Sequence, residues 1–91
     1  METNTEKIHL NQKVKRIVAE VMSVQENSFD ESSDLRTELE IDSMDVVTIA
    51  ALLSDELGFE AEIEDIPEGA ITVTWITEQI LYQIKHRAKS E

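Results

Sequence analysis

Apolar side chains recur at helical spacing in three separate stretches of the chain. In the first stretch their spacing follows an i, i+4, i+7, i+8 pattern, and polar side chains fill the positions between them. The apolar positions of this stretch are Leu10, Val14, Ile17, Val18, Val21 and Met22. The pattern predicts an amphipathic helix over about residues 6–23.

The second stretch predicts a helix over residues 43–57. One apolar stripe consists of Val46, Ile49, Ala50, Leu53 and Leu57, and it is widened by Met44, Val47 and Ala51. A helix with so broad an apolar arc is expected to contact more than one neighbour. Gly58 follows directly, and we expect it to end the helix in the left-handed conformation.

The third stretch predicts a last helix that begins around Thr72 or Thr74. Its inward positions are Val73, Ile76, Ile80 and Ile84. The basic end of the chain suits a helix C-terminus, because cations there interact favourably with the helix dipole. These basic residues are Lys85, His86, Arg87 and Lys89.

Two polar connections join the three helices. Residues 24–42 form a long loop, which is either functional or contains a short helical turn near Asp34–Glu38. The expected anchors of this loop on the core are Phe29, Leu35, Leu39 and Ile41. In the second connection Phe59, Ile63 and Ile66 are the expected anchors. Pro67 is compatible with the first turn of a short helix that ends near Gly69.

The predicted fold is all-α: a small bundle of three or four helices with a long loop between the first and the second. A chain of 91 residues leaves no room for a second core, so we expect one domain over 1–91, with frayed ends at 1–6 and 87–91. Only two glycines and one proline are present, which argues against a turn-rich all-β design.

Charge narrows the classes of partner. The formal net charge is −12, and Arg36 is the only base among sixteen acids between Ser23 and Ile84. This distribution argues against nucleic acid and anionic membranes as partners and favours proteins with basic patches, although a merely soluble surface is an equal alternative. No apolar run is as long as that of a signal peptide or a membrane span, so we expect a cytoplasmic protein.

Several kinds of chemistry are not supported by the sequence. There is no cysteine, which excludes disulfides and thiol chemistry by the chain itself. Neither an EF-hand loop nor a glycine-rich phosphate loop is present. His9 and His86 lie in opposite terminal helices and are interpreted as surface residues. We therefore predict no metal site. Composition alone does not exclude a Ser-His-Asp triad, but a helical bundle of 91 residues rarely offers the cleft that a hydrolase needs. We also expect a monomer.

The run Asp42-Ser43-Met44-Asp45 stands where the acidic loop gives way to the second helix. One interpretation is a capped helix start, with Asp42 as N-cap and Asp45 at the third helical position. The other is functional. A phosphoryl group on Ser43 would lie beside unpaired backbone N–H groups, and Asp42 and Asp45 are placed to hold Mg²⁺ for a phosphoryl-transfer enzyme. The geometry suits a serine that is modified rather than one that attacks.

The stretch from Glu38 to Leu57, ELEIDSMDVVTIAALLSDEL, resembles the acyl carrier protein signature of a loop, an Asp-Ser-Leu-like triplet and an acidic amphipathic helix. The similarity continues at Phe59, Ile63 and Ile71-Thr72 and covers roughly residues 8–84. It implies that a carrier protein synthase, a phosphopantetheinyl transferase, attaches phosphopantetheine from coenzyme A to Ser43. Cargo would then be carried on the thiol of this arm as a thioester. The resemblance thus implies a carrier protein, the substrate of this transferase, and not an enzyme.

The same resemblance implies roles for the surrounding residues. Asp42 would help the synthase to place Mg²⁺, and Met44 would pack near the base of the arm. Acids that would dock on the basic patches of acyl-transferring or condensing enzymes are Asp45, Asp55, Glu56 and Glu40. Residues that would line an interior for a fatty cargo are Val47, Ala51, Leu53, Phe59, Ile63 and Ile76.

The sequence also departs from the family pattern. Glu40 stands where glycine is common, Met44 where leucine is usual and Thr48 where a glutamate is usual, and Trp75 is an atypical aromatic. These departures favour a specialised bacterial-type carrier for fatty acid, polyketide or related lipid biosynthesis.

Two alternatives stay open: an aminoacyl or D-alanyl carrier, and a helical adaptor that carries nothing. Small side chains at Val47, Ala51 and Val73 would leave room for a chain, whereas a filled core would favour a small cargo held outside.

Overall fold

The computed structural model describes residues 2–63 and 66–90, and the side chains of 6–63 and 66–86 among them. Its elements, in chain order, are α1 (Glu2–Met22), the 3-10 turn η1 (Glu26–Ser28), α2 (Leu35–Glu38), α3 (Ser43–Leu57) and α4 (Val73–Ser90). The described residues contain no strand. The predicted all-α bundle with a long first loop is therefore confirmed.

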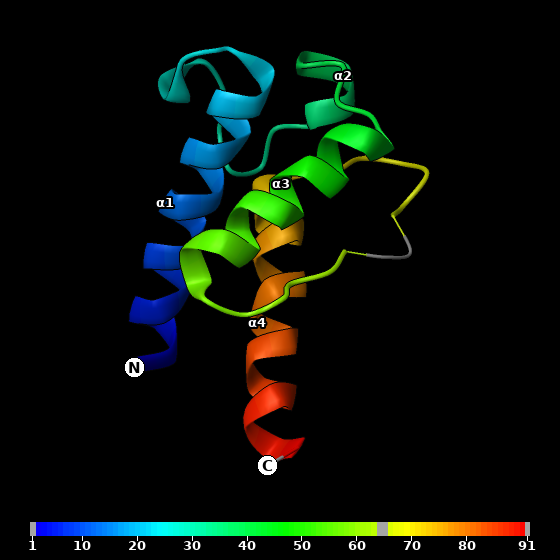
Figure 1. Cartoon of the computed structure of the whole chain (residues 1–91). Helices are drawn as coiled ribbons and strands as arrows, with labels where there is room; N and C mark the ends of the chain where they lie inside the picture. Colours follow the sequence, from blue (N-terminus) through cyan, green and yellow to red (C-terminus); the bar gives the residue numbers. More distant parts are fainter. Residues whose placement is uncertain (1, 64–65, 91) are drawn as a thin grey trace.

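The helices pack around one aliphatic core. Figure 1 shows α1 and α4 alongside each other, α3 crossing in front of α4, and both chain ends at the same end of the bundle. α1 packs against both α3 and α4. The side chains with almost no exposed surface include Val14 and Ile17 of α1, Ile49 and Leu53 of α3, and Ile76 and Ile80 of α4. The apolar faces predicted for the three long helices thus meet in this core.

α3 begins and ends as predicted. Asp42 is its N-cap, and Gly58 ends it in the left-handed conformation with φ 78°. α1 begins at Glu2, earlier than the expected residue 6, and α4 begins at Val73, between the two expected starts. The fraying expected at 1–6 and 87–91 stays a prediction.

The long loop contains the helical turn that its length indicated. α2 covers Leu35–Glu38, and the Leu35 N–H donates to the Ile71 carbonyl at 2.7 Å, which ties this loop to the second connection. Phe29, Leu35 and Ile41 are buried as expected, while Leu39 is half-buried. The loop therefore covers one end of the core.

The prediction of a short helix that has Pro67 in its first turn and ends near Gly69 is wrong. No described residue between Gly58 and Val73 is helical. The backbone of this connection bonds to other elements instead: the Pro67 carbonyl accepts from the Arg36 guanidinium, and the Ile71 N–H donates to the Asp34 carboxylate at 3.3 Å. Backbone groups satisfied in this way do not need helical partners.

Among residues 2–63 and 66–90, none of the helices combines the length and apolar character needed to cross a membrane.

Candidate functional site

Ser43 is the first residue of α3, and its side chain is exposed. The two aspartates beside it form a reciprocal capping box. The Asp45 N–H donates to the Asp42 carboxylate at 3.0 Å, and the Asp42 N–H donates to the Asp45 carboxylate at 3.1 Å. The Ser43 hydroxyl makes no hydrogen bond within the described residues. Asp42 therefore caps the helix, and the Ser43 hydroxyl remains available for chemistry.

The turn that leads into Ser43 contains a strained residue. Glu40 has φ 59°, in the left-handed region that costs a residue with a side chain about 1–2 kcal/mol. Glycine adopts this conformation without that cost, which explains physically why glycine is common at this position in the family that the sequence resembles. Glu40 itself is exposed and makes no hydrogen bond or ion pair among the described residues.

The four acids expected to dock on partners have different surroundings. Asp45 is half-buried in the capping box, whereas Asp55 is exposed and, in the described part of the chain, unpaired. Glu56 accepts two hydrogen bonds from the Arg16 guanidinium at 2.9 Å and one from Lys13 at 3.2 Å. The hydrogen bond to Arg16, followed by that to Lys13, lowers the pKa of the Glu56 carboxyl. Glu56 thus binds α3 to α1.

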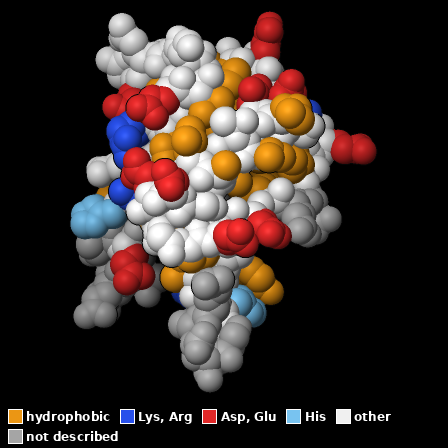
Figure 2. Space-filling model, viewed as in Figure 1, with side chains coloured by type: hydrophobic (Ala, Val, Ile, Leu, Met, Phe, Trp, Pro, Cys, Tyr) orange, Lys and Arg blue, Asp and Glu red, His pale blue; other side chains and the backbone are white. Residues whose placement is uncertain are grey.

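An apolar stripe follows Ser43 along the exposed face of α3. This outer stripe consists of Met44, Val47 and Ala51, which the helix repeat places on one side. Met44 is 71% exposed and Val47 is 54% exposed. Figure 2 shows hydrophobic side chains gathered over α3, with acidic side chains around them. Exposed apolar side chains that are grouped in this way are typical of surfaces that contact another molecule.

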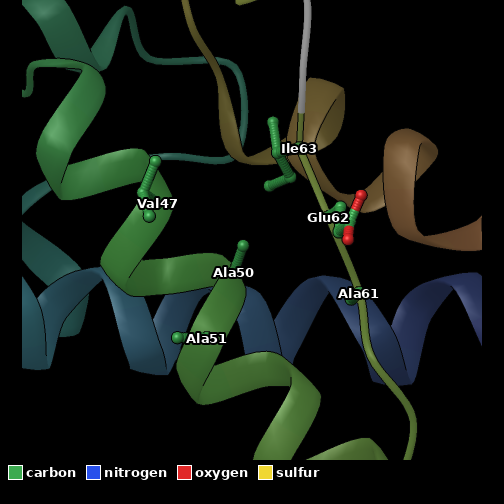
Figure 3. A pocket seen from close by; sticks show the side chains of 6 residues that line it. All are labelled: Val47, Ala50, Ala51, Ala61, Glu62 and Ile63. Carbon is green, nitrogen blue, oxygen red and sulfur yellow. The ribbon is translucent and has the colours of Figure 1, made fainter.

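A groove of about 420 Å³ lies beside the outer stripe. Its residues are Val47, Ala50 and Ala51 of α3 and Ala61, Glu62 and Ile63 of the segment that follows (Figure 3). Volumes of this order are usual for ligand sites in proteins. The groove begins one helical turn after Ser43, so a group attached to Ser43 starts close to it.

The predicted cargo residues separate into two groups. Val47, Ala51 and Ile63 line the groove, whereas Leu53 and Ile76 are completely buried in the core and Phe59 is half-buried against it. Sequence reasoning missed Ala50, Ala61 and Glu62. The small side chains of the two alanines are a weak signal of a groove, and nothing in the sequence indicated that Glu62 lies beside α3.

Other candidate groups lie at the surface. His9 and His86 are both exposed, and the His86 ring lies 3.9 Å from that of Tyr82. No cluster of three or more His, Asp or Glu side chains that could hold a metal ion occurs in the described ranges. The chemistry of this face therefore centres on the Ser43 hydroxyl, the outer stripe and the groove.

Comparison with known proteins decides the family. The family described as phosphopantetheine attachment site matches residues 12–74, a range that includes α2, α3 and the groove. The chain belongs to this family. The "Acyl carrier protein" of Saccharopolyspora erythraea is 31% identical to it over 70 residues, which are 77% of this chain and 73% of that relative. No solved structure matches the chain significantly.

The protein is thus a phosphopantetheine-bearing carrier and not an enzyme, as the resemblance implied. A carrier of this family requires a phosphopantetheinyl transferase as a partner. The start of α3 fits the prosthetic group on two counts. Ser43 offers an exposed hydroxyl without a bond among the described residues, and the apolar outer stripe begins at the next residue. The group supplies the thiol that the chain lacks, because the chain has no cysteine.

Proposed function

We propose that Ser43 carries the phosphopantetheine, and that the protein passes acyl intermediates as thioesters between enzymes of fatty acid, polyketide or related lipid biosynthesis. The observation that supports this most strongly is the exposed Ser43 hydroxyl, which the Asp42 cap leaves without a structural task. In the loading reaction the Ser43 oxygen loses its proton and bonds to the pyrophosphate phosphorus of coenzyme A that carries the pantetheine. The bond from this phosphorus to the bridging oxygen breaks, and adenosine 3′,5′-bisphosphate leaves with that oxygen. Asp42, next to the reacting serine, would help to hold the Mg²⁺ of the transferase.

The partners of this carrier dock on the outer stripe and on the acids around it. Asp55 lies eleven residues after Met44, so the helix repeat places it in line with the stripe. Glu40 lies at the other end, before Ser43. An apolar centre with acidic ends fits enzymes that present an apolar strip between basic patches, and the charges steer the encounter. The monomeric state and the cytoplasmic location stay predictions.

The test is the intact mass of the protein after incubation with coenzyme A, Mg²⁺ and a broad-specificity phosphopantetheinyl transferase. We expect a gain of one phosphopantetheinyl group in the wild type and in Thr48→Ala, and no gain in Ser43→Ala. Thr48 is a suitable control because its hydroxyl, also exposed on α3, bonds among the described residues only to the Met44 carbonyl of its own helix, at 3.0 Å. A folded wild type that gains no mass, or Ser43→Ala that gains it, would contradict the proposal.

One observation favours a second candidate, a carrier of a small cargo such as an aminoacyl group. Leu53, Val73 and Ile76 have no exposed surface and fill the interior, and the groove lies at the surface. Methyl NMR spectra of Val47 and Ile63 distinguish the two. An octanoyl cargo that lies in the groove shifts these methyl signals relative to an alanyl cargo, whereas identical spectra would favour the small cargo held outside.

A further inference from the structure

One wall of the groove is a segment without secondary structure of its own. It runs over Ala61–Ile63, and none of these three residues is helical. Ala61 and Ile63 are almost completely buried, while Glu62 is exposed between them. A wall of this kind keeps its position only if something fixes its backbone, because an irregular segment lacks the hydrogen bonds of a helix or a sheet.

Ser54 of α3 fixes the wall on one side. Its hydroxyl oxygen accepts from the Ala61 N–H at 2.7 Å. The hydroxyl hydrogen has two acceptors within reach, the Ala61 carbonyl at 3.1 Å and the Ala50 carbonyl at 2.9 Å. Thr48 bonds back to its own helix. Ser54 can do the same, but it also binds the wall to α3.

Gln83 of α4 fixes the next residue of the wall. Its amide oxygen accepts from the Glu62 N–H at 2.9 Å, and its amide nitrogen donates to the Glu62 carbonyl. One side chain thus satisfies both backbone groups of Glu62, as a neighbouring strand would in a sheet. Together, Ser54 and Gln83 hold two consecutive wall residues from two different helices, opposite Val47, Ala50 and Ala51.

We propose that Ser54 and Gln83 are positioning residues that fix the width of the groove, and that they thereby limit the size of the cargo that the groove shelters. The inference rests on the proposed function, because only a loaded carrier has a cargo to shelter. It adds a physical determinant of cargo choice, which lies in two polar side chains outside the predicted cargo residues.

The first test does not need the cargo. Amide hydrogen exchange is measured on the unmodified full chain, for the wild type, Ser54→Ala and Gln83→Ala. Matched controls are Thr48→Ala and Gln79→Ala, since Gln79 lies one turn before Gln83 and its side chain makes no hydrogen bond among the described residues. We expect exchange at Ala61 to rise about fivefold or more in Ser54→Ala, and exchange at Glu62 to do so in Gln83→Ala, with no such change in the controls.

The second test measures shelter of the cargo. Octanoyl and acetyl groups are loaded as thioesters, and their reaction rates with hydroxylamine are compared in each variant. We expect the octanoyl thioester to react several-fold more slowly than the acetyl thioester in the wild type and both controls. In Ser54→Ala and Gln83→Ala the two rates should approach each other while the melting temperature stays near that of the controls. Ser54→Thr, which keeps the hydroxyl, should restore the difference.

Two results would overturn the inference: equal rates for the two thioesters in the wild type, or an undiminished difference in both alanine variants. If either alanine variant fails to fold, Gln83→Glu takes its place. This variant keeps an acceptor for the Glu62 N–H but loses the donor to the Glu62 carbonyl. In Gln83→Glu the octanoyl and acetyl rates should lie closer together than in Gln79→Ala, and a difference as large as in Gln79→Ala would contradict the inference. Failure of the proposed function is distinguishable, since it appears as no gain of mass at loading and leaves the exchange result intact.

Discussion

The outer stripe and the end of α3 have different relations to the rest of the protein. Ser43 at the start of the helix is exposed, and so is the outer stripe of Met44, Val47 and Ala51 that follows it. Near its end, two polar side chains are bound to other elements, Ser54 to the wall of the groove and Glu56 to α1, while Asp55 between them is exposed. One helix therefore combines an exposed apolar stripe with side chains that hold it to neighbouring elements.

This difference shows that acids of equal charge are not equal docking groups. Asp55 and Glu56 are neighbours in the sequence, and both were expected to contact partners. Glu56 is held between Arg16 and Lys13, whereas Asp55 makes no ion pair among the described residues. A carboxylate that already has two cationic partners offers less to a basic patch than one that has none.

The largest expected effect compares a buried with an exposed apolar residue of α3. Leu53→Ala should lower the free energy of unfolding by about 2–5 kcal/mol, because it leaves a cavity among buried neighbours. Val47→Ala should cost far less, because Val47 is 54% exposed. Urea denaturation of both variants checks this. A mild loss in Leu53→Ala would mean that Leu53 lines a space for cargo, as the sequence had suggested, and not a filled core.

A smaller effect distinguishes the two neighbouring acids. Asp55→Asn and Glu56→Gln each remove one negative charge with little change of shape. Loading by the transferase at low salt should slow several-fold in Asp55→Asn and less in Glu56→Gln, because Asp55 is in line with the outer stripe and unpaired in the described part of the chain. Both effects should shrink at high salt. Stronger slowing in Glu56→Gln would contradict the assignment of Asp55 to docking and of Glu56 to the fold.

The smallest effect is the pH dependence of stability. Hydrogen bonds from Arg16 and then Lys13 lower the pKa of Glu56, so this carboxylate stabilises the fold above its ordinary pKa of about 4.3. The contribution is lost as the pH falls through the lowered pKa. Thermal unfolding between pH 2 and 6 should therefore show a weaker acid dependence in Glu56→Gln than in Asp55→Asn.

Asp34 also makes the stability of the fold depend on pH, in the wild type and in both variants. Its pKa is lowered by the Thr37 hydroxyl, and further by the N–H groups of Ile71 and Arg36, and both variants retain these bonds. Some loss of stability in acid should consequently persist in both. Identical pH curves for the two variants would show that the contacts of Glu56 contribute nothing to the fold.

Local signals made the start of α3 predictable. The Asp42 cap, Asp45 at the third position and Gly58 at the end are residue types that specify helix ends by their own chemistry. The exposure of Ser43 followed from the same signals, since the residue after an N-cap lies in the first turn. The aliphatic core was predictable as well, because its residues recur at helical spacing.

Contacts between residues distant in the sequence were not predictable. Arg16 and Glu56 are 40 residues apart, and no periodicity indicates that they meet. The expected helix at Pro67–Gly69 failed for a similar reason, because this segment bonds to Arg36 and Asp34 rather than to itself. An apolar stripe likewise shows which side chains face inward, as Leu53 and Ile76 do, but not whether they fill the interior.

The central claim is that the exposed hydroxyl at the start of α3 carries the prosthetic group. Tandem mass spectrometry of the loaded protein tests it most directly, because fragment ions assign the added mass to one residue. Ser32 and Ser33 in the long loop and Ser54 on α3 are the internal comparisons, since they share the chemistry of Ser43 but not its place. We predict that the phosphopantetheinyl group lies on Ser43 alone. The same mass on any other serine would contradict the account.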